Sequence, residues 1–206
     1  MSFTLWFMGL PAAGKSTLAK RTEQRLRDHD YLVENLDGDE VRTNLHPDLG
    51  FSKQDRATNN RRTAYICSLL NRNDITVVTG MITPFRESQQ EARKIVEENG
   101  EFVLIYVKCS VETCAERDPK DLYEQAREGK IENFTGVNHP FQEPHNPDIV
   151  VNTEVEGIDA SVHHLWERLQ ELGILQSPAE EYEFRISRDE EEKIKERLRD
   201  IDHIHM

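Results

Sequence analysis

The feature that most constrains this chain is a glycine-rich segment near its start, Gly9-Leu10-Pro11-Ala12-Ala13-Gly14-Lys15-Ser16. Its spacing is G-x-x-x-x-G-K-[ST], with an apolar, strand-like run (3–8) before it and a helical pattern (15–27) after it. Glycines let backbone N–H groups reach phosphate oxygens, and the helix presents its positive end to them. The segment therefore predicts a nucleoside triphosphate site in which Lys15 contacts the β- and γ-phosphates and Ser16 binds Mg²⁺.

Strand-like and helix-like segments alternate along the chain as far as about residue 173. The apolar runs predict strands at 3–8, 31–36, 75–82, 102–107 and 149–151. Helical patterns cover 15–27, 52–71, 84–99, 111–117 and 158–172. This alternation predicts an α/β fold of the P-loop NTPase type, which is a parallel sheet with helices on both faces.

Two stretches of the chain depart from this alternation. Residues 118–147 are polar and irregular, which is typical of a functional lid, and we expect the lid at about 118–136. After a P-loop domain at 1–176, the composition shifts, and 177–206 forms a charged extension. Within it, 187–201 has a narrow apolar stripe at helical spacing, which predicts an amphipathic helix with a solvated face.

Composition limits the partners that this protein can have. The chain is 36% hydrophobic and 32% charged, with a net charge of −13, which argues against nucleic-acid binding because phosphate backbones require a surplus of Lys and Arg. A few clustered cations can still bind a small phosphorylated ligand. No signal peptide or long apolar run is visible, and the three cysteines lack C-x-x-C spacing. We therefore expect a cytoplasmic protein without a membrane partner.

A second group of candidate residues follows the second predicted strand. Asp37-Gly38-Asp39 lies at the strand end, where open parallel sheets place ligand-binding groups, although such a segment taken alone is more often a simple turn. Its carboxylates can orient Mg²⁺ or accept a proton from an acceptor hydroxyl. Arg42 follows, and Arg56 and Asn59 share one face of the next predicted helix. These groups suit an anionic acceptor, and a solvated basic face is the alternative.

Five motifs carry a resemblance to a known family. They are Leu36-Asp37-Gly38-Asp39-x-Val41-Arg42; Asp48-Leu49-Gly50-Phe51-Ser52 with Asp55-Arg56-x-x-Asn59-x-Arg61-Arg62; Ile82-Thr83-Pro84-Phe85-Arg86; Arg117-Asp118-Pro119-Lys120-x-Leu122-Tyr123; and Ala126-Arg127-x-Gly129 with Asn133-Phe134-Thr135-Gly136. In this order they resemble the adenylylsulfate kinase family. The match covers roughly residues 3–173, and five ordered motifs are far more specific than any one of them.

The resemblance implies an activity and a set of site residues. The family transfers the γ-phosphate of ATP, with Mg²⁺, to the 3′-hydroxyl of adenosine 5′-phosphosulfate (APS), and it suggests a homodimer. The implied catalytic residues are Lys15, Asp37 and Asp39, with Ser16 and Asp37 at the metal. ATP would be bound by Gly9, Leu10, Pro11, Ala12, Ala13, Gly14, Lys15, Ser16, Thr17, Arg117 and Lys120. APS would be bound by Asp39, Arg42, Phe51, Arg56, Asn59, Ile82, Thr83, Pro84 and Phe134, with Phe51 and Phe134 sandwiching its adenine.

The chain also departs from the family pattern in three places. Thr83 stands where the family often has a serine that can carry a phosphate in some members; Thr83 keeps the hydroxyl but adds a methyl, so the resemblance is not extended to a phosphorylated intermediate. Pro11-Ala12-Ala13 replaces more usual small polar and glycine residues, and 177–206 has no counterpart. Two alternatives stay open at this point: a related kinase that acts on another small nucleotide or metabolite hydroxyl, and a non-catalytic ATP-binding regulatory domain.

Overall fold

A computed structural model describes residues 2–118 and 120–175. Residues Met1–Ile174 form one compact unit, and everything below concerns this unit. The amphipathic helix predicted within 187–201 lies outside the described residues. In the described part of the chain, no helix is both long enough and apolar enough to cross a membrane.

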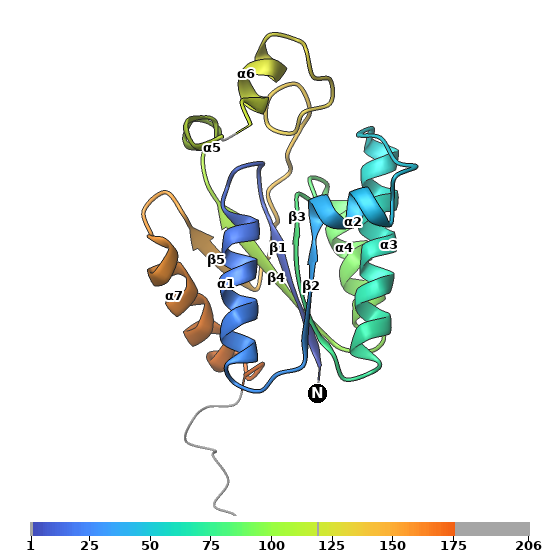
Figure 1. The fold of residues 1–206 in the computed structure, drawn as a ribbon, viewed down its shortest axis with the longest axis vertical. Helices are drawn as coiled ribbons and strands as arrows, with labels where there is room; N and C mark the ends of the chain where they lie inside the picture. Colours follow the sequence, from blue (N-terminus) through green and yellow to red (C-terminus); the bar gives the residue numbers. More distant parts are fainter. Residues whose placement is uncertain (1, 119, 176–206) are drawn as a thin grey trace, which may run out of the picture. The chain divides into compact units, whose positions relative to one another are not determined.

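The centre of the unit is one five-stranded parallel sheet with the order β2-β3-β1-β4-β5 (Figure 1). Its strands are β1 (Phe3–Met8), β2 (Val33–Asp37), β3 (Thr76–Met81), β4 (Glu101–Lys108) and β5 (Ile149–Asn152). The central strand, β1, pairs with β3 and β4, and all six of its residues are buried. A strand that is covered on both faces has a continuous apolar sequence, which is why residues 3–8 were predicted correctly.

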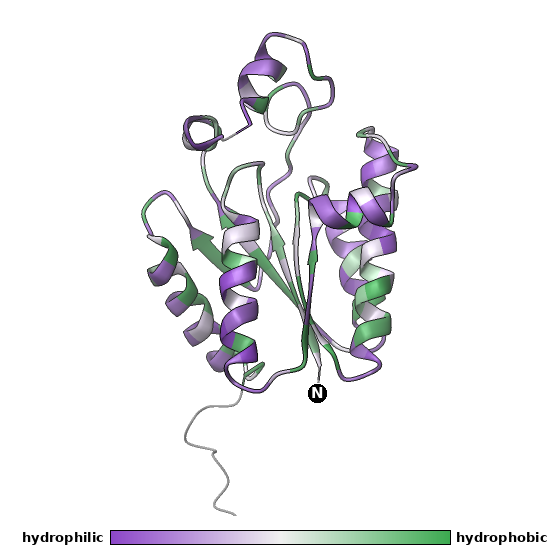
Figure 2. Ribbon diagram, viewed as in Figure 1, coloured by the Kyte–Doolittle hydropathy of each residue, from purple (hydrophilic) through white to green (hydrophobic). Residues whose placement is uncertain are grey.

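Helices cover both faces of this sheet, as the alternating pattern predicted (Figure 1). Helices α1 (Lys15–Arg27) and α7 (Ile158–Glu171) pack together on one face, and α3 (Lys53–Asn71) and α4 (Arg86–Val96) pack together on the other. Beneath α3 and α4, buried residues of these helices pack against Trp6 and Met8 of β1 and against β3 and β4. Figure 2 shows the strands as largely hydrophobic and the outer helix faces as hydrophilic.

Of the three short helices, two were not predicted from the sequence. The Asp-Gly-Asp segment is not a simple turn but the start of α2 (Gly38–Asn44), with the Asp37 side chain as its N-cap. Helix α5 (Val111–Arg117) has the predicted bounds, but α6 (Leu122–Arg127) lies in the stretch predicted to be irregular. Six residues are too few to show a helical period, so no local pattern predicted α6.

Each strand delivers one part of the site to the same edge of the sheet. In a parallel sheet the carboxyl ends of the strands meet at one edge, and ligands bind there. The glycine-rich loop follows β1, α2 follows β2, and residues 82–84 follow β3. Helix α5 follows β4, and residues 120–136, which contain α6 and are called the α6 region, come after α5. The loop into α7 follows β5.

Candidate active site

A cavity of about 1260 Å³ lies at this edge and is lined by residues from every one of these connections. Eighteen of the predicted site residues line it: Pro11, Ala12, Gly14, Lys15, Ser16, Thr17, Asp37, Asp39, Arg42, Phe51, Arg56, Asn59, Ile82, Thr83, Pro84, Arg117, Lys120 and Phe134. The remaining three, Gly9, Leu10 and Ala13, are buried and do not line the cavity. They shape the glycine-rich loop from beneath.

The glycine-rich loop folds in a way that only small residues permit. A Cβ atom on Gly9 would lie 2.5 Å from the backbone oxygen of Val107 in β4, so a side chain there would displace the strand. Gly14, at the start of α1, has a φ of 98°, and Ala12 has a φ of 58°. The left-handed conformation costs an alanine about 1–2 kcal/mol, and Ala12 bears this cost in the loop.

Lys15 is a buried cation in the ligand-free loop. Its Nζ donates a hydrogen bond to the backbone oxygen of Leu10 at 2.6 Å. Burial lowers the pKa of Lys15 to about 8. Electrostatic interactions with Cys114, Asp39 and Asp37 raise this pKa and offset part of the effect of burial. A buried ammonium that is so weakly compensated favours an anionic ligand next to it, as a triphosphate would be.

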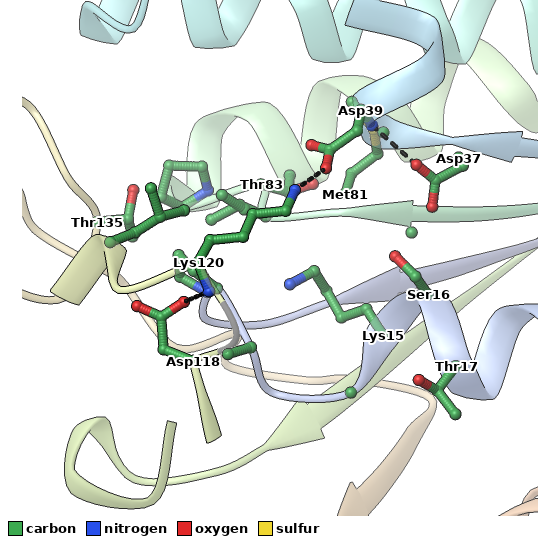
Figure 3. A pocket seen from close by; sticks show the side chains of 18 of the residues that line it. Lys15, Ser16, Thr17, Asp37, Asp39, Met81, Thr83, Asp118, Lys120 and Thr135 are labelled. Carbon is green, nitrogen blue, oxygen red and sulfur yellow. Dashed lines mark hydrogen bonds and ion pairs between the residues drawn. The ribbon is translucent and has the colours of Figure 1, made fainter. Parts of the chain in front are cut away.

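The oxygen atoms of Ser16 and Asp37 form a donor set that fits Mg²⁺. Figure 3 shows the Ser16 hydroxyl, from the first turn of α1, and the Asp37 carboxylate, from the end of β2, turned toward each other. Asp37 Oδ1 accepts a hydrogen bond from the backbone N–H of Asp39 at 3.0 Å, which fixes the carboxylate. Hydroxyl and carboxylate oxygens, completed by phosphate oxygens and water, are what Mg²⁺ prefers.

Asp39 extends into the cavity from the first turn of α2 and meets a lysine from the α6 region. Lys120 Nζ lies 3.2 Å from Asp39 Oδ2 (Figure 3). The two side chains are 65% and 87% exposed, so this ion pair contributes little stability and is easily replaced by a phosphate oxygen. The arrangement therefore leaves both groups available to a ligand.

Two arginines supply positive charge at the β2 and α3 end of the cavity. Arg56 donates from Nε to the Phe51 oxygen at 3.0 Å and from Nη2 to the Asn133 oxygen at 2.7 Å. Burial, and then repulsion from Arg42, lowers the pKa of Arg56 to about 10. Among the described residues, neither arginine forms a salt bridge. Arg56 is buried and Arg42 is half-buried, and two such guanidinium groups without a carboxylate partner among the described residues fit a multiply charged anion.

Phe51 and Phe134 line the same cavity but differ in exposure. Phe51 is 54% exposed, and the guanidinium of Arg42 lies 4.6 Å from its ring centre. Phe134 is 8% exposed, with its ring in edge-to-face contact with Tyr123 at 4.9 Å. One ring is therefore open to a ligand, while the other is held by the α6 region.

Thr83 is held in a strained conformation at the wall of the cavity. Its φ of 42° is rare for a β-branched residue. The indole Nε1 of Trp6 donates to its hydroxyl oxygen at 2.9 Å, and Gln89 Nε2 donates to its backbone oxygen at 3.2 Å. Thr83 is 1% exposed, so it contributes little accessible surface to the cavity wall in which it lies.

Comparison with known proteins identifies the family. A family model described as adenylylsulphate kinase matches residues 1–152. The chain belongs to the adenylylsulphate kinase family. The adenylyl-sulfate kinase of Rippkaea orientalis is 45% identical over 175 residues, which are 85% of this chain and 95% of that protein. The one from Halothermothrix orenii is 43% identical, with 85% and 93% of the two chains covered.

A solved structure agrees with the sequence comparison. It is the APS kinase of Mycobacterium tuberculosis in complex with AMPPNP and APS, at a TM-score of 0.79 and 36% identity. The match covers 82% of this chain and 98% of that one. The predicted P-loop fold and the predicted family are therefore both confirmed.

In this member of the adenylylsulphate kinase family, the loop after β5 contributes a site residue, Thr153, that was not predicted from the sequence. Arg117 was placed near the phosphates, and the structure anchors it on Thr153, with Nη2 at 2.5 Å from the backbone oxygen. The Thr153 hydroxyl donates to the backbone oxygen of Ala13 at 3.0 Å. Thr153 therefore joins Arg117 to the glycine-rich loop. Its position after a parallel strand was the signal that could have identified it.

Tyr123 was also missed as a site residue, although it stands in one of the five motifs. Its hydroxyl donates to the backbone oxygen of Pro11 at 2.9 Å, and its ring packs on Phe134. Its backbone N–H donates to Asp118 Oδ2 at 2.8 Å. Tyr123 therefore joins the α6 region to the glycine-rich loop.

We expect Tyr123→Phe to lower kcat/KM for ATP by about three- to tenfold, because it removes the hydrogen bond to Pro11 and keeps the ring. Steady-state kinetics with varied ATP measures this effect. Tyr65→Phe is the matched control, because Tyr65 is 59% exposed on α3. Equal kinetics for the wild type and Tyr123→Phe would contradict the role of this hydroxyl.

Proposed function

We propose that this protein is an ATP-dependent kinase that phosphorylates the 3′-hydroxyl of APS in sulfate activation. The observation that carries this proposal is one cavity with two different anion-binding ends. The glycine-rich loop and Lys15 lie at the first, and Arg42 and Arg56, which form no salt bridge with another described residue, lie at the second. The related M. tuberculosis APS kinase is in complex with AMPPNP and APS, which supports the proposed pair of substrates.

On the ATP side, we assign the triphosphate to the glycine-rich loop. Lys15 would leave the Leu10 oxygen and contact the β- and γ-phosphates, and the loop N–H groups would bind the remaining oxygens. Arg117 and Thr153 would border the nucleoside. Mg²⁺, held by Ser16 and Asp37, would supply charge neutralisation at the phosphates. The protein's contribution is to fix the γ-phosphate toward the acceptor end.

On the acceptor side, we assign the phosphosulfate to Arg42, Arg56 and Asn59 and the adenine to the surface between Phe51 and Phe134. Asp39 would accept the proton of the 3′-hydroxyl, because it is the exposed carboxylate between the two ends. Lys120 would leave Asp39 for a phosphate oxygen as the site fills. Ile82, Thr83 and Pro84 would form the wall.

The domain boundaries and the assembly belong to the same proposal. We assign the kinase domain to 1–176, with a lid at about 118–136 that excludes water from the reacting phosphate, and an extension at 177–206. From the family resemblance we propose a homodimer. The free cysteines Cys67, Cys109 and Cys114 are consistent with the reducing environment of the cytoplasm.

A panel of acceptors tests the proposed substrate. Purified protein with ATP and Mg²⁺ is expected to form ADP at least about a hundredfold faster with APS than with AMP, because AMP lacks the charged sulfate. Gluconate and adenosine serve as further acceptors, and a reaction without acceptor measures hydrolysis. Faster turnover with any of these than with APS would identify a different acceptor. ATP binding without turnover on any acceptor would favour a regulatory domain.

A further inference from the structure

His46 is a buried histidine behind the acceptor end of the cavity. It lies in the connection between α2 and α3, is 3% exposed and does not line the cavity. Its Nδ1 lies 2.8 Å from the side-chain oxygen Oδ1 of Asn59, which is 4% exposed and does line the cavity. His46 therefore contacts a proposed acceptor-binding residue without lining the cavity itself.

This contact fixes which end of the Asn59 amide faces the cavity. An amide has an acceptor oxygen and a donor NH₂ group, and the two can be exchanged by rotation. With Oδ1 as the acceptor in this contact, the matching His46 tautomer is the one that carries its proton on Nδ1. The amide nitrogen Nδ2 then forms no hydrogen bond to another described residue, which leaves it as a free donor on a residue that lines the cavity. Asn59 lies one helical turn from Arg56, whose guanidinium is also a donor and has no carboxylate partner within 2–118 and 120–175.

We propose that His46 is a positioning residue that holds Asn59 with its NH₂ group toward the acceptor, so that the amide donates to an acceptor anion such as the sulfate. This inference rests on the proposed function. In this proposal, His46 determines which end of the Asn59 amide dipole, the NH₂ group or the oxygen, is directed toward the acceptor. With the amide reversed, a carbonyl oxygen would face the anion and repel it.

The backbone of His46 has a separate structural role, which the test must exclude. Its N–H donates to the Val41 oxygen at 3.1 Å, and its oxygen accepts from Leu49 at 3.2 Å. A substitution keeps these backbone bonds. A purely structural side chain would change stability and both KM values together, whereas a positioning side chain changes the KM for the acceptor alone.

Substitutions at Asn59 test the direction of the amide. Asn59→Ala should raise the KM for APS about tenfold, since it removes one donor. Asn59→Asp keeps the shape and the His46 contact but presents a carboxylate oxygen, and it should raise the KM for APS about a hundredfold or more. The KM for ATP should stay within about twofold in both variants. An Asn59→Asp enzyme with a KM for APS at or below that of Asn59→Ala would overturn the proposal.

Substitutions at His46 test the positioning. His46→Leu should raise the KM for APS about tenfold with little change in kcat, and His46→Asn, whose amide N–H replaces Nδ1–H, should restore it. In the Asn59→Ala background, His46→Leu should have no further effect on the KM for APS. His163→Leu is the matched control, because His163 is exposed on α7. An unchanged KM in His46→Leu, or no rescue by His46→Asn, would overturn the proposal.

A spectroscopic measurement separates this inference from the proposed function. Long-range ¹H–¹⁵N correlation of the wild-type protein in alkaline buffer reports which ring nitrogen of His46 is protonated. A proton on Nδ1 supports the proposal even if APS is not the acceptor, and a proton on Nε2 overturns it even if APS is phosphorylated. Failure of the wild type to phosphorylate APS would contradict only the proposed function.

Discussion

Lys15→Ala is expected to lower kcat by about a thousandfold or more, because it removes a preorganised charge from the phosphoryl group being transferred. In the wild type, Lys15 Nζ donates a hydrogen bond to the backbone oxygen of Leu10 at 2.6 Å. A rotation of the Lys15 side chain is enough to direct Nζ from this oxygen to a phosphate bound in the loop. Acceptor-dependent ADP formation at saturating ATP measures the effect. Turnover within tenfold of the wild type would contradict the role of Lys15 at the β- and γ-phosphates.

Loss of activity in Lys15→Ala should not come from unfolding. The substitution removes a buried ammonium whose pKa is lowered by burial, so its removal relieves a desolvation cost. We expect a midpoint of thermal unfolding equal to or above that of the wild type. Lys20→Ala, at an exposed position of the same helix, is the matched control and should keep full activity.

Arg56→Ala is expected to raise the KM for APS about a hundredfold and to change the KM for ATP less than about threefold. Arg56 lies at the acceptor end, and the glycine-rich loop lies at the other end of the cavity. Arg61→Ala, an exposed position on α3, is the matched control. Equal losses for both substrates would show that Arg56 does not belong to the acceptor side.

Arg56 also forms structural hydrogen bonds, and a second substitution, Arg56→Lys, distinguishes their effect from that of the positive charge. Its guanidinium bonds the Phe51 and Asn133 oxygens and so joins α3 to the α6 region. Arg56→Lys keeps the charge but cannot form the same fork of hydrogen bonds. A KM for APS intermediate between those of the wild type and Arg56→Ala is expected. A value equal to that of Arg56→Ala would assign the loss to the fork alone.

Local patterns predicted most of the fold and the part of the site next to the glycine-rich loop. Residues 3–8 have a strand sequence because β1 is buried on both faces, and the helical pattern at 52–71 corresponds to α3, with Ser52 as its N-cap. The Asp-Gly-Asp segment was placed correctly at the end of β2, but its helix was not predicted. Asp and Gly are common both in helix N-caps and in turns. Whether such a segment begins a helix or forms a turn therefore depends on the residues that follow it.

The residues that sequence reasoning missed act through contacts between distant segments. Thr153 contacts Ala13, and Tyr123 contacts Pro11, across 140 and 112 positions. His46 and Asn59 lie on different elements, and their shared hydrogen bond has no sequence period. The strained φ of Thr83 follows from Trp6 and Gln89, which hold it from two other elements. Such contacts depend on how the elements pack, which no local pattern records.

The most direct test of the central claim is the identity of the product. Protein, ATP and APS are incubated with Mg²⁺, and the nucleotide product is isolated and examined by ³¹P nuclear magnetic resonance and mass spectrometry. The account predicts one added phosphate, attached as a monoester at the 3′-oxygen of an intact adenosine 5′-phosphosulfate, with one ADP formed for each product molecule. A phosphate at any other position, or ADP formed without a phosphorylated nucleotide, would contradict it.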